Sequence, residues 1–222
     1  MQPSVADMAH DDAGPAEPTL GSRRFGLATL AIAVVAALLA GFAIGVLALR
    51  PAAAPADDSP EAGFARDMIT HHDQAVEMGM IAYTEAELPG VRQIAYDIAT
   101  NQQGEIGMMH QWLREWELGP TAAEPPMAWM PDGDAMGGAP MPGMASRDQM
   151  AELREAEGIA VDQLFLELMI DHHLGGIHMI DGVLELTDHS EVVWLAELMK
   201  SGQQHELEVL RNLQQQAADH SG

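Results

Sequence analysis

The sequence predicts an all-α fold, in which one transmembrane helix precedes a four-helix bundle made from a duplicated helical hairpin. Three observations support this prediction. A long run without any charged residue lies at 25–49, and helix start and stop signals recur through the rest of the chain, where no strand-like alternation is found. A motif of phenylalanine, methionine and paired histidines is also repeated at a fixed spacing.

Composition restricts the chemistry open to this chain. Its 222 residues include 10 Lys and Arg against 34 Asp and Glu, for a formal net charge of −24, and no cysteine. A chain this negative is poorly suited to bind a phosphate backbone, so no nucleic-acid partner is expected. Without cysteine there are no disulfides, no thiolate nucleophile and no Cys-type zinc or iron–sulfur site. A soft metal ligand must therefore be methionine sulfur or histidine nitrogen.

The N-terminal part predicts a membrane anchor. Residues 1–24 are polar and without periodicity, which is typical of a disordered tail. At about 1.5 Å per residue, the uncharged run 25–49 exceeds the roughly 30 Å of a bilayer core, and it is longer than a signal-peptide apolar region of about 15 residues. Arg23 and Arg24 precede the run and favour a cytoplasmic N-terminus with the rest of the chain outside. Small residues in the 50–58 linker resemble a signal-peptidase cleavage site, so a released, secreted form is an alternative.

The exported domain is predicted over 59–218, and its first hairpin over 59–118. Ser59 and Pro60 give an N-cap and first helical position, which open a helix expected to reach about Glu87. Pro89 interrupts it and starts a second helix, which is expected to end near Leu118 before Gly-Pro.

The crossover and second hairpin follow, at 119–145 and 146–218. The crossover is rich in Pro, Gly and Met and has no periodicity, so it is expected to be a loop. Ser146 and Gln149 form a capping-box signature for a short helix that ends near Gly158. Asp162 is predicted to cap a long helix to about Thr187, and a last helix is expected from Ser190 to about Gln216.

The strongest signal is the internal repeat. Its first motif occurs in two copies at an offset of 165 − 64 = 101, and the same offset holds further along each hairpin. The copies are Phe64-x-x-x-Met68-Ile69-x-His71-His72 with Phe165-x-x-x-Met169-Ile170-x-His172-His173, then Met78 with Met179, then Gln102-Gln103-x-Glu105 with Gln203-Gln204-x-Glu206. Two distant motifs kept in register indicate a duplicated hairpin, and two hairpins bury their apolar stripes against each other as a four-helix bundle.

The repeated residues share helix faces. At about 100° per residue, His72 lies about 40° from Met68 and His71 about 60° away on the other side. If these faces point inward, imidazoles, thioethers and carboxylates meet in the bundle interior. The predicted metal-ligating residues are Met68, His71, His72, Met78, Glu105, Met108, Met109, Met169, His172, His173, Met179 and Glu206.

This donor set predicts a metal-ion partner, with copper as Cu(I) or Cu(II) first and silver or iron as alternatives. Thioethers suit Cu(I) and Ag(I), and imidazole also suits Cu(II). Neighbouring histidines cannot easily chelate one ion from a regular helix, so one of each pair is expected to ligate while Glu105 or Glu206 accepts an imidazole N–H. The helical methionines are equally compatible with core packing alone.

Other histidines, tryptophans and loop methionines carry weaker signals. His178 is expected on the outer face, and the tryptophans at 112, 116 and 194 are expected in the core or at its edge. Methionines in a loop without periodicity are not predicted to be core residues, so the crossover methionines suggest weak Cu(I) or Ag(I) binding beside Asp132 and Asp134. They are Met127, Met130, Met136, Met141 and Met144.

These motifs resemble the domain-of-unknown-function 305 family over roughly residues 59–216. The resemblance implies a ferritin-like bundle, usually exported or anchored, and it makes copper the leading metal because some members are associated with copper. Gly175-Gly176 departs from the first copy, which has Gln74-Ala75. Because each helical glycine costs about 1 kcal/mol relative to alanine, a kink or a close approach of another helix is expected there.

The leading hypothesis is a membrane-anchored extracytoplasmic protein that binds copper or silver for buffering, tolerance or handover. The sequence favours a binding protein over an enzyme but does not decide between them. One alternative is a di-iron redox enzyme, although no glutamate has a histidine three residues later, as such sites require. Another is a metal-free structural or interaction domain. The sequence predicts no oligomeric state.

Overall fold

The computed structural model describes residues 26–48, 54–131 and 141–220, and it divides into two units, 1–52 and 53–222. The first unit contains helix α1 (Leu27–Ala48), within the run predicted to be helical. Its segment Leu27–Val46 has a mean hydropathy of 2.6 and is long enough to cross a membrane. The predicted tail at 1–24 lies outside the described residues, as do Asp132, Asp134 and Met136.

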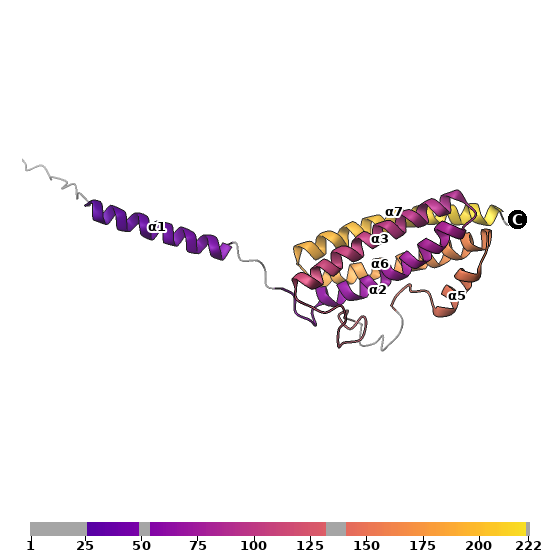
Figure 1. The fold of residues 1–222 in the computed structure, drawn as a ribbon, viewed down its shortest axis with the longest axis horizontal. Helices are drawn as coiled ribbons and strands as arrows, with labels where there is room; N and C mark the ends of the chain where they lie inside the picture. Colours follow the sequence, from indigo (N-terminus) through magenta and orange to yellow (C-terminus); the bar gives the residue numbers. More distant parts are fainter. Residues whose placement is uncertain (1–25, 49–53, 132–140, 221–222) are drawn as a thin grey trace, which may run out of the picture. The chain divides into compact units, whose positions relative to one another are not determined.

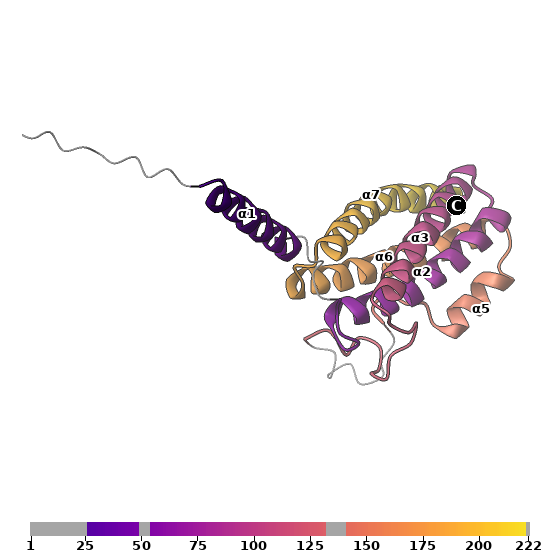
Figure 2. The same cartoon turned by 60° about the vertical axis from the view of Figure 1, so that its left-hand side comes forward.

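The second unit is helical, as the sequence predicts. Four long helices, α2, α3, α6 and α7, pack lengthwise, with α2 against α3, α6 against α7, and α2 against α6 (Figure 1; Figure 2 shows the same helices after a rotation of 60°). The short helix α5 lies beside α2 and α6. The bounds are α2 (Pro60–Glu85), α3 (Pro89–Glu115), α5 (Arg147–Glu155), α6 (Ile159–Leu186) and α7 (Ser190–His220).

Capping residues set most of the helix ends. Ser59 Oγ accepts a hydrogen bond from the backbone N–H of Ala62 at 3.3 Å, and Pro60 occupies the first helical position. Ser146 and Gln149 form the predicted capping box in both directions. The α3 helix ends at Glu115, before Leu118, because Glu117 takes a positive φ of 59° that breaks the helical repeat.

Asp162 does not cap its own helix, contrary to the prediction. The α6 helix begins earlier, at Ile159, after Gly158 adopts a φ of 57°. Asp162 is buried within the first turn, where its carboxylate accepts hydrogen bonds from the backbone N–H groups of Glu87 at 2.7 Å and Leu88 at 2.8 Å. It therefore satisfies the backbone donors at the turn into α3, which otherwise lacks a side-chain cap.

The core consists of two clusters that the repeat relates to each other. Met68 and Met179 pack in one cluster, and Met78 and Met169 pack in the other. The first methionine of α2 therefore packs with the second of α6, and the second of α2 packs with the first of α6. This arrangement is expected for two antiparallel helices that cross near their middles. The two hairpins are therefore related by an approximate two-fold axis.

The four crossover methionines that the structure describes belong to the core or pack against it, which corrects the expectation from periodicity. Met127 and Met141 are buried in the same cluster as Met68, and Met130 and Met144 pack against it half-buried. A loop that folds over the end of a bundle contributes core residues without helical spacing. Trp112 and Trp116 are buried as expected, whereas Trp194 is 58% exposed.

Candidate metal centre

The four paired histidines lie together in the bundle interior. His71 and His72 on α2 and His172 and His173 on α6 are each at most 1% exposed. The ring centroids of His71 and His172 are 3.7 Å apart, and the rings within each pair are 6.4 and 6.5 Å apart. The helix faces selected by the repeat therefore do point inward, and they bring the imidazoles of both hairpins into one buried group.

Each hairpin contains one imidazole–carboxylate pair. His72 Nε2 lies 2.8 Å from Glu105 Oε2, and His173 Nε2 lies 2.7 Å from Glu206 Oε2. The glutamate side chains are 16% and 13% exposed, so they connect buried rings to the surface. Both copies thus have the carboxylate acceptor that the spacing predicts.

The other histidine of each pair is held by backbone carbonyls. His71 Nε2 donates to the carbonyl oxygen of Pro142 at 3.1 Å, and His172 Nε2 donates to the carbonyl oxygen of His71 at 2.9 Å. A carbonyl oxygen is only an acceptor, which places a proton on Nε2 of both rings. The two hairpins differ here, because the acceptor of His71 belongs to the crossover and the acceptor of His172 belongs to α2.

Burial keeps His71 and His172 neutral. Burial lowers the pKa of His71 from 6.5 to about 3, with a further contribution from the neighbouring His72 imidazole. Burial and then the facing His71 ring lower the pKa of His172 well below its usual value. Two imidazolium ions at this spacing would be desolvated and would repel each other, so both rings carry one proton each.

Among the four paired histidines, three buried nitrogens have no hydrogen-bond partner in the described part of the chain. They are Nδ1 of His71, of His72 and of His173. In a neutral ring whose Nε2–H donates to a carbonyl or carboxylate oxygen, Nδ1 carries a lone pair. A buried unpaired acceptor costs about 1–3 kcal/mol, and a metal ion is one group that satisfies it. These residues therefore fit a metal with imidazole ligands.

The predicted thioethers do not converge on one point. Met68 and Met78 are ten residues apart on one helix, about 15 Å along its axis, and lie in separate core clusters. Met109 is buried with Met68, whereas the half-buried Met108 lies beside Glu105 at the surface of the bundle. Sulfur is therefore available on both sides of the histidine group, and it is more abundant at the crossover end.

A groove between α3 and α7 reaches the carboxylates. Its volume is about 550 Å³, and both Glu105 and Glu206 line it. The remaining lining residues are Asn101, Gln102, Gly104, Met108, Leu198, Met199, Gly202 and Gln203.

The crossover covers the histidines at another face of the bundle. A Cβ atom on Gly175 would lie 2.1 Å from the Pro142 carbonyl oxygen, so only glycine admits the loop there. In the first copy, Gln74 holds the same loop by accepting from the backbone N–H of Ala145 and donating to its carbonyl, at 2.7 and 2.9 Å. The close approach of another helix expected at this pair is found at Gly176, where a Cβ atom would lie 2.6 Å from Gln203 Oε1 of α7. At Gly175 the approaching segment is the crossover loop, which the sequence does not predict.

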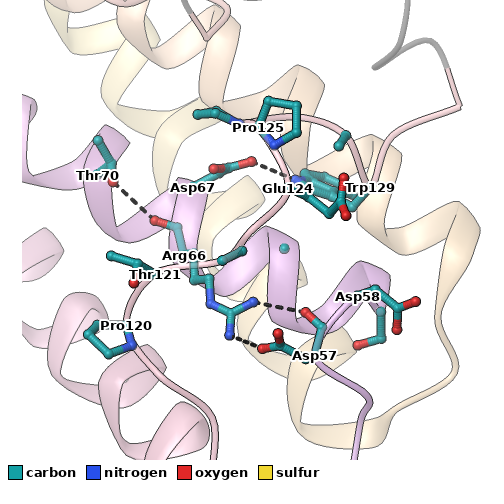
Figure 3. Close-up of a pocket in the computed structure, with 15 residues that line it drawn as sticks. Asp57, Asp58, Arg66, Asp67, Thr70, Pro120, Thr121, Glu124, Pro125 and Trp129 are labelled. Carbon is teal, nitrogen blue, oxygen red and sulfur yellow. Dashed lines mark hydrogen bonds and ion pairs between the residues drawn. The ribbon is translucent and has the colours of Figure 1, made fainter.

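A second cavity, of about 460 Å³, lies where the crossover leaves α3 (Figure 3). Its buried charges are paired: Arg66 donates to Gly119 and Asp57, and Asp67 accepts from the backbone of Met127 and from Trp129 Nε1. Burial raises the pKa of the Asp67 carboxyl, which these two hydrogen bonds partly oppose. These contacts anchor the crossover to α2.

The family described as "Domain of unknown function (DUF305)" matches residues 61–214. The chain belongs to the DUF305 family. No curated protein matches this DUF305 chain. A DUF305 protein of Streptomyces coelicolor, described as secreted, is 39% identical with a TM-score of 0.68, and the match covers 73% of this chain and 96% of that one.

Solved structures of two further proteins are similar to this chain. A DUF305 fragment from Deinococcus radiodurans is 26% identical with a TM-score of 0.61, over 75% of this chain and 99% of that one. CopM in a Cu(II)-bound form is 25% identical with a TM-score of 0.55, over 71% and 97%. CopM structures with Cu(I) and with Ag share the fold at 23% identity.

Sequence reasoning on this DUF305 chain missed part of the site. Gln102 and Gln203 stand out in the repeat but were not predicted as site residues, although they line the groove. No sequence signal indicates that Pro142 contacts His71. Within 26–48, 54–131 and 141–220, no three His, Asp or Glu side chains form a cluster able to hold a metal. The described residues therefore place neither the carboxylate-rich cluster of a di-iron centre nor three imidazoles around a single point.

Proposed function

We propose that this protein is a membrane-anchored, extracytoplasmic binder of copper or silver that serves in buffering, tolerance or handover. The main support is the group of buried imidazoles with three unpartnered Nδ1 atoms. Such atoms are rare in protein interiors unless water, an ion or a ligand completes them.

The donor types favour soft cations. Imidazole combined with methionine thioether suits Cu(I) and Ag(I), and imidazole alone also suits Cu(II). The solved CopM forms with Cu(II), Cu(I) and Ag are consistent with such cargo in a protein of this fold. The ligands proposed here are the imidazoles of both pairs, with thioethers from either core cluster.

Glu105 and Glu206 are proposed to act through the imidazoles. A carboxylate that accepts Nε2–H fixes the ring and its tautomer and makes the opposite nitrogen a better ligand. The observed separations of 2.8 and 2.7 Å suit this arrangement. The metal contributes a positive charge that the half-buried carboxylates help to neutralise.

Location outside the cell is supported by the basic residues that precede α1, by the acidic composition and by a related protein. The apolar helix is preceded by Arg23 and Arg24, which favours retention of the N-terminus in the cytoplasm. The net charge of −24 raises the local concentration of cations around the protein. A related protein described as secreted also supports export.

The test is metal titration of the full chain in detergent, with Cu(I) under reducing conditions and with Ag(I). Replacement of His71, His72, His172 and His173 together by Gln is expected to abolish stoichiometric binding, with the helical content checked by circular dichroism. A matched triple variant at the exposed residues His178, His205 and His220 is expected to bind as the wild type does. Equal binding by both variants would remove the proposal.

A further inference from the structure

The groove between α3 and α7 has an approximate symmetry that matches the repeat. Gln102 and Glu105 on α3 correspond to Gln203 and Glu206 on α7, at the offset of 101, and all four line the groove. These residues come from helices that belong to different hairpins. The groove therefore lies on the seam where the two hairpins meet.

Two buried amides on this seam lack partners. Gln102 is 3% exposed, and neither its Oε1 nor its Nε2 has a hydrogen-bond partner among the described residues. Gln203 is 4% exposed, and its Oε1 is also without one. Buried side-chain amides are normally satisfied, so each of these oxygens has capacity for a ligand. Gln203 Oε1 lies toward α6, 2.6 Å from where a Cβ atom on Gly176 would be, so it lies on the inner side of the groove.

Two glycines, which destabilise a helix interior, also keep the groove open. Gly104 and Gly202 line it, and a Cβ atom at either position would meet nothing within 4 Å. Glycine in a helix interior is less stable than alanine, and here no close contact requires it. Because both positions are glycine, no side chain fills the groove at either of them.

The carboxylates join the groove to the imidazoles. Glu105 and Glu206 line the groove and at the same time contact His72 and His173, whose rings are fully buried. On another face the crossover carbonyl of Pro142 covers His71. Of these two approaches, the groove is the one that carboxylate and amide side chains line.

We propose that the α3–α7 groove is the port through which a metal cation enters and leaves the imidazole group, held on the way by the oxygen atoms of Gln102, Gln203, Glu105 and Glu206. The proposal rests on the proposed function. The carboxylates and amides replace water around the cation, and it then passes to nitrogen and sulfur ligands, which soft cations prefer. No bond other than metal–ligand bonds forms or breaks.

The first experiment blocks the groove without touching a ligand. Gly104→Leu with Gly202→Leu places two side chains in open space, so the fold is retained and Tm is expected to be unchanged or higher. Gly107→Leu is the matched control, because Gly107 is equally open but does not line the groove. The rate of Ag(I) uptake by the full chain is measured by stopped flow against a chromophoric chelator.

The blocked variant is expected to take up and release Ag(I) at least about tenfold more slowly, because entry then requires the side chains to move aside. The number of ions bound at equilibrium is expected to stay the same, and Gly107→Leu is expected to match the wild type. Equal rates in all three proteins, with metal bound, would overturn the port while leaving the proposed function intact. Absence of Ag(I) and Cu(I) binding in the wild type would overturn both.

A second experiment removes the amide oxygens. Gln102→Leu with Gln203→Leu keeps side-chain size and is expected to slow Ag(I) uptake by about tenfold, since the cation loses two oxygen ligands on its path. The control replaces the exposed neighbours Gln103 and Gln204 by Leu and is expected to leave the rate unchanged. Equal effects of the two variants would contradict a role for the amides.

Discussion

The imidazole rings of His71 and His172 face each other with centroids 3.7 Å apart and planes tilted by 33°. The two residues occupy equivalent positions of the repeat, so each hairpin contributes one ring to the contact at the approximate two-fold axis. His172 Nε2 also donates to the backbone carbonyl of His71 at 2.9 Å. The histidine group is therefore formed by the association of the hairpins, and neither hairpin contains it alone.

The metal-free protein is expected to lose stability as the pH falls below 6.5. The pKa of His71 is about 3 in the folded protein against an ordinary value of 6.5, so at pH 5 this residue is neutral when folded and protonated when unfolded. Unfolding then takes up protons, and each such histidine lowers the free energy of unfolding by about 1.4 kcal/mol per pH unit. Urea unfolding between pH 7 and 5 measures the slope.

Variants assign that slope to the buried rings. His71→Gln is expected to reduce it by at least the contribution of one histidine, because His172 also loses its facing ring. His178→Gln, at an exposed position of α6, is expected to leave the slope as in the wild type. A slope that His71→Gln does not change would show that other groups control the pH dependence.

Loss of the carboxylate acceptors is expected to weaken metal binding without unfolding the protein. Glu105→Gln and Glu206→Gln keep the size of each side chain but remove the charge that orients the imidazole and favours the bound cation. Such changes typically lower affinity by about 10–100-fold. Competition titration with Cu(I) measures this, and Glu115→Gln at an exposed position of α3 is the control. An unchanged affinity in both variants would assign the glutamates to folding alone.

The repeat explains why much of the site was predictable. Residues kept at one offset in two copies must satisfy the same local environment twice. This selects the inward face of α2, which carries His72, and the inward face of α3, which carries Glu105. Helix ends at Ser59 and Ser146 were also predictable, because capping depends on contacts within one turn.

Features that depend on contacts between distant segments were not predictable. Asp162 looks like a cap in sequence, but its partners are the backbone N–H groups of Glu87 and Leu88 in the other hairpin. The burial of Met127 and Met141 likewise depends on how the crossover folds over the bundle. Hydrophobic periodicity predicts which face of a single helix is buried, but it does not predict how a distant loop packs against that helix.

Methionine-to-leucine variants distinguish packing from ligation. Met68→Leu with Met179→Leu changes one core cluster, and Met78→Leu with Met169→Leu changes the other. Leucine has a similar volume, so each replacement is expected to cost less than about 1.5 kcal/mol. Where the sulfurs are ligands, Cu(I) affinity is expected to fall while Cu(II) affinity is kept, because thioethers prefer the softer ion.

The measurement is a Cu(I) and Cu(II) titration of each double variant, together with thermal unfolding of the metal-free protein. We expect the larger loss of Cu(I) affinity in the Met68 and Met179 variant, because its cluster holds further thioethers of the crossover. Unchanged Cu(I) affinity in both double variants would mean that these methionines only fill the core.

Gly175→Ala is expected to destabilise the protein by disturbing the crossover. The new Cβ atom would lie 2.1 Å from the carbonyl oxygen of Pro142, and neither α6 nor the loop has a flexible side chain there to move aside. Displacing the loop removes the acceptor of His71 Nε2, so we expect a loss of about 1–3 kcal/mol. Each kcal/mol lowers Tm by about 2–4 °C in a chain of this size. Gly104→Ala, which faces open space, is expected to raise stability by up to about 1 kcal/mol. If both variants raised Tm equally in thermal unfolding, the crossover would not be held against α6 at Gly175.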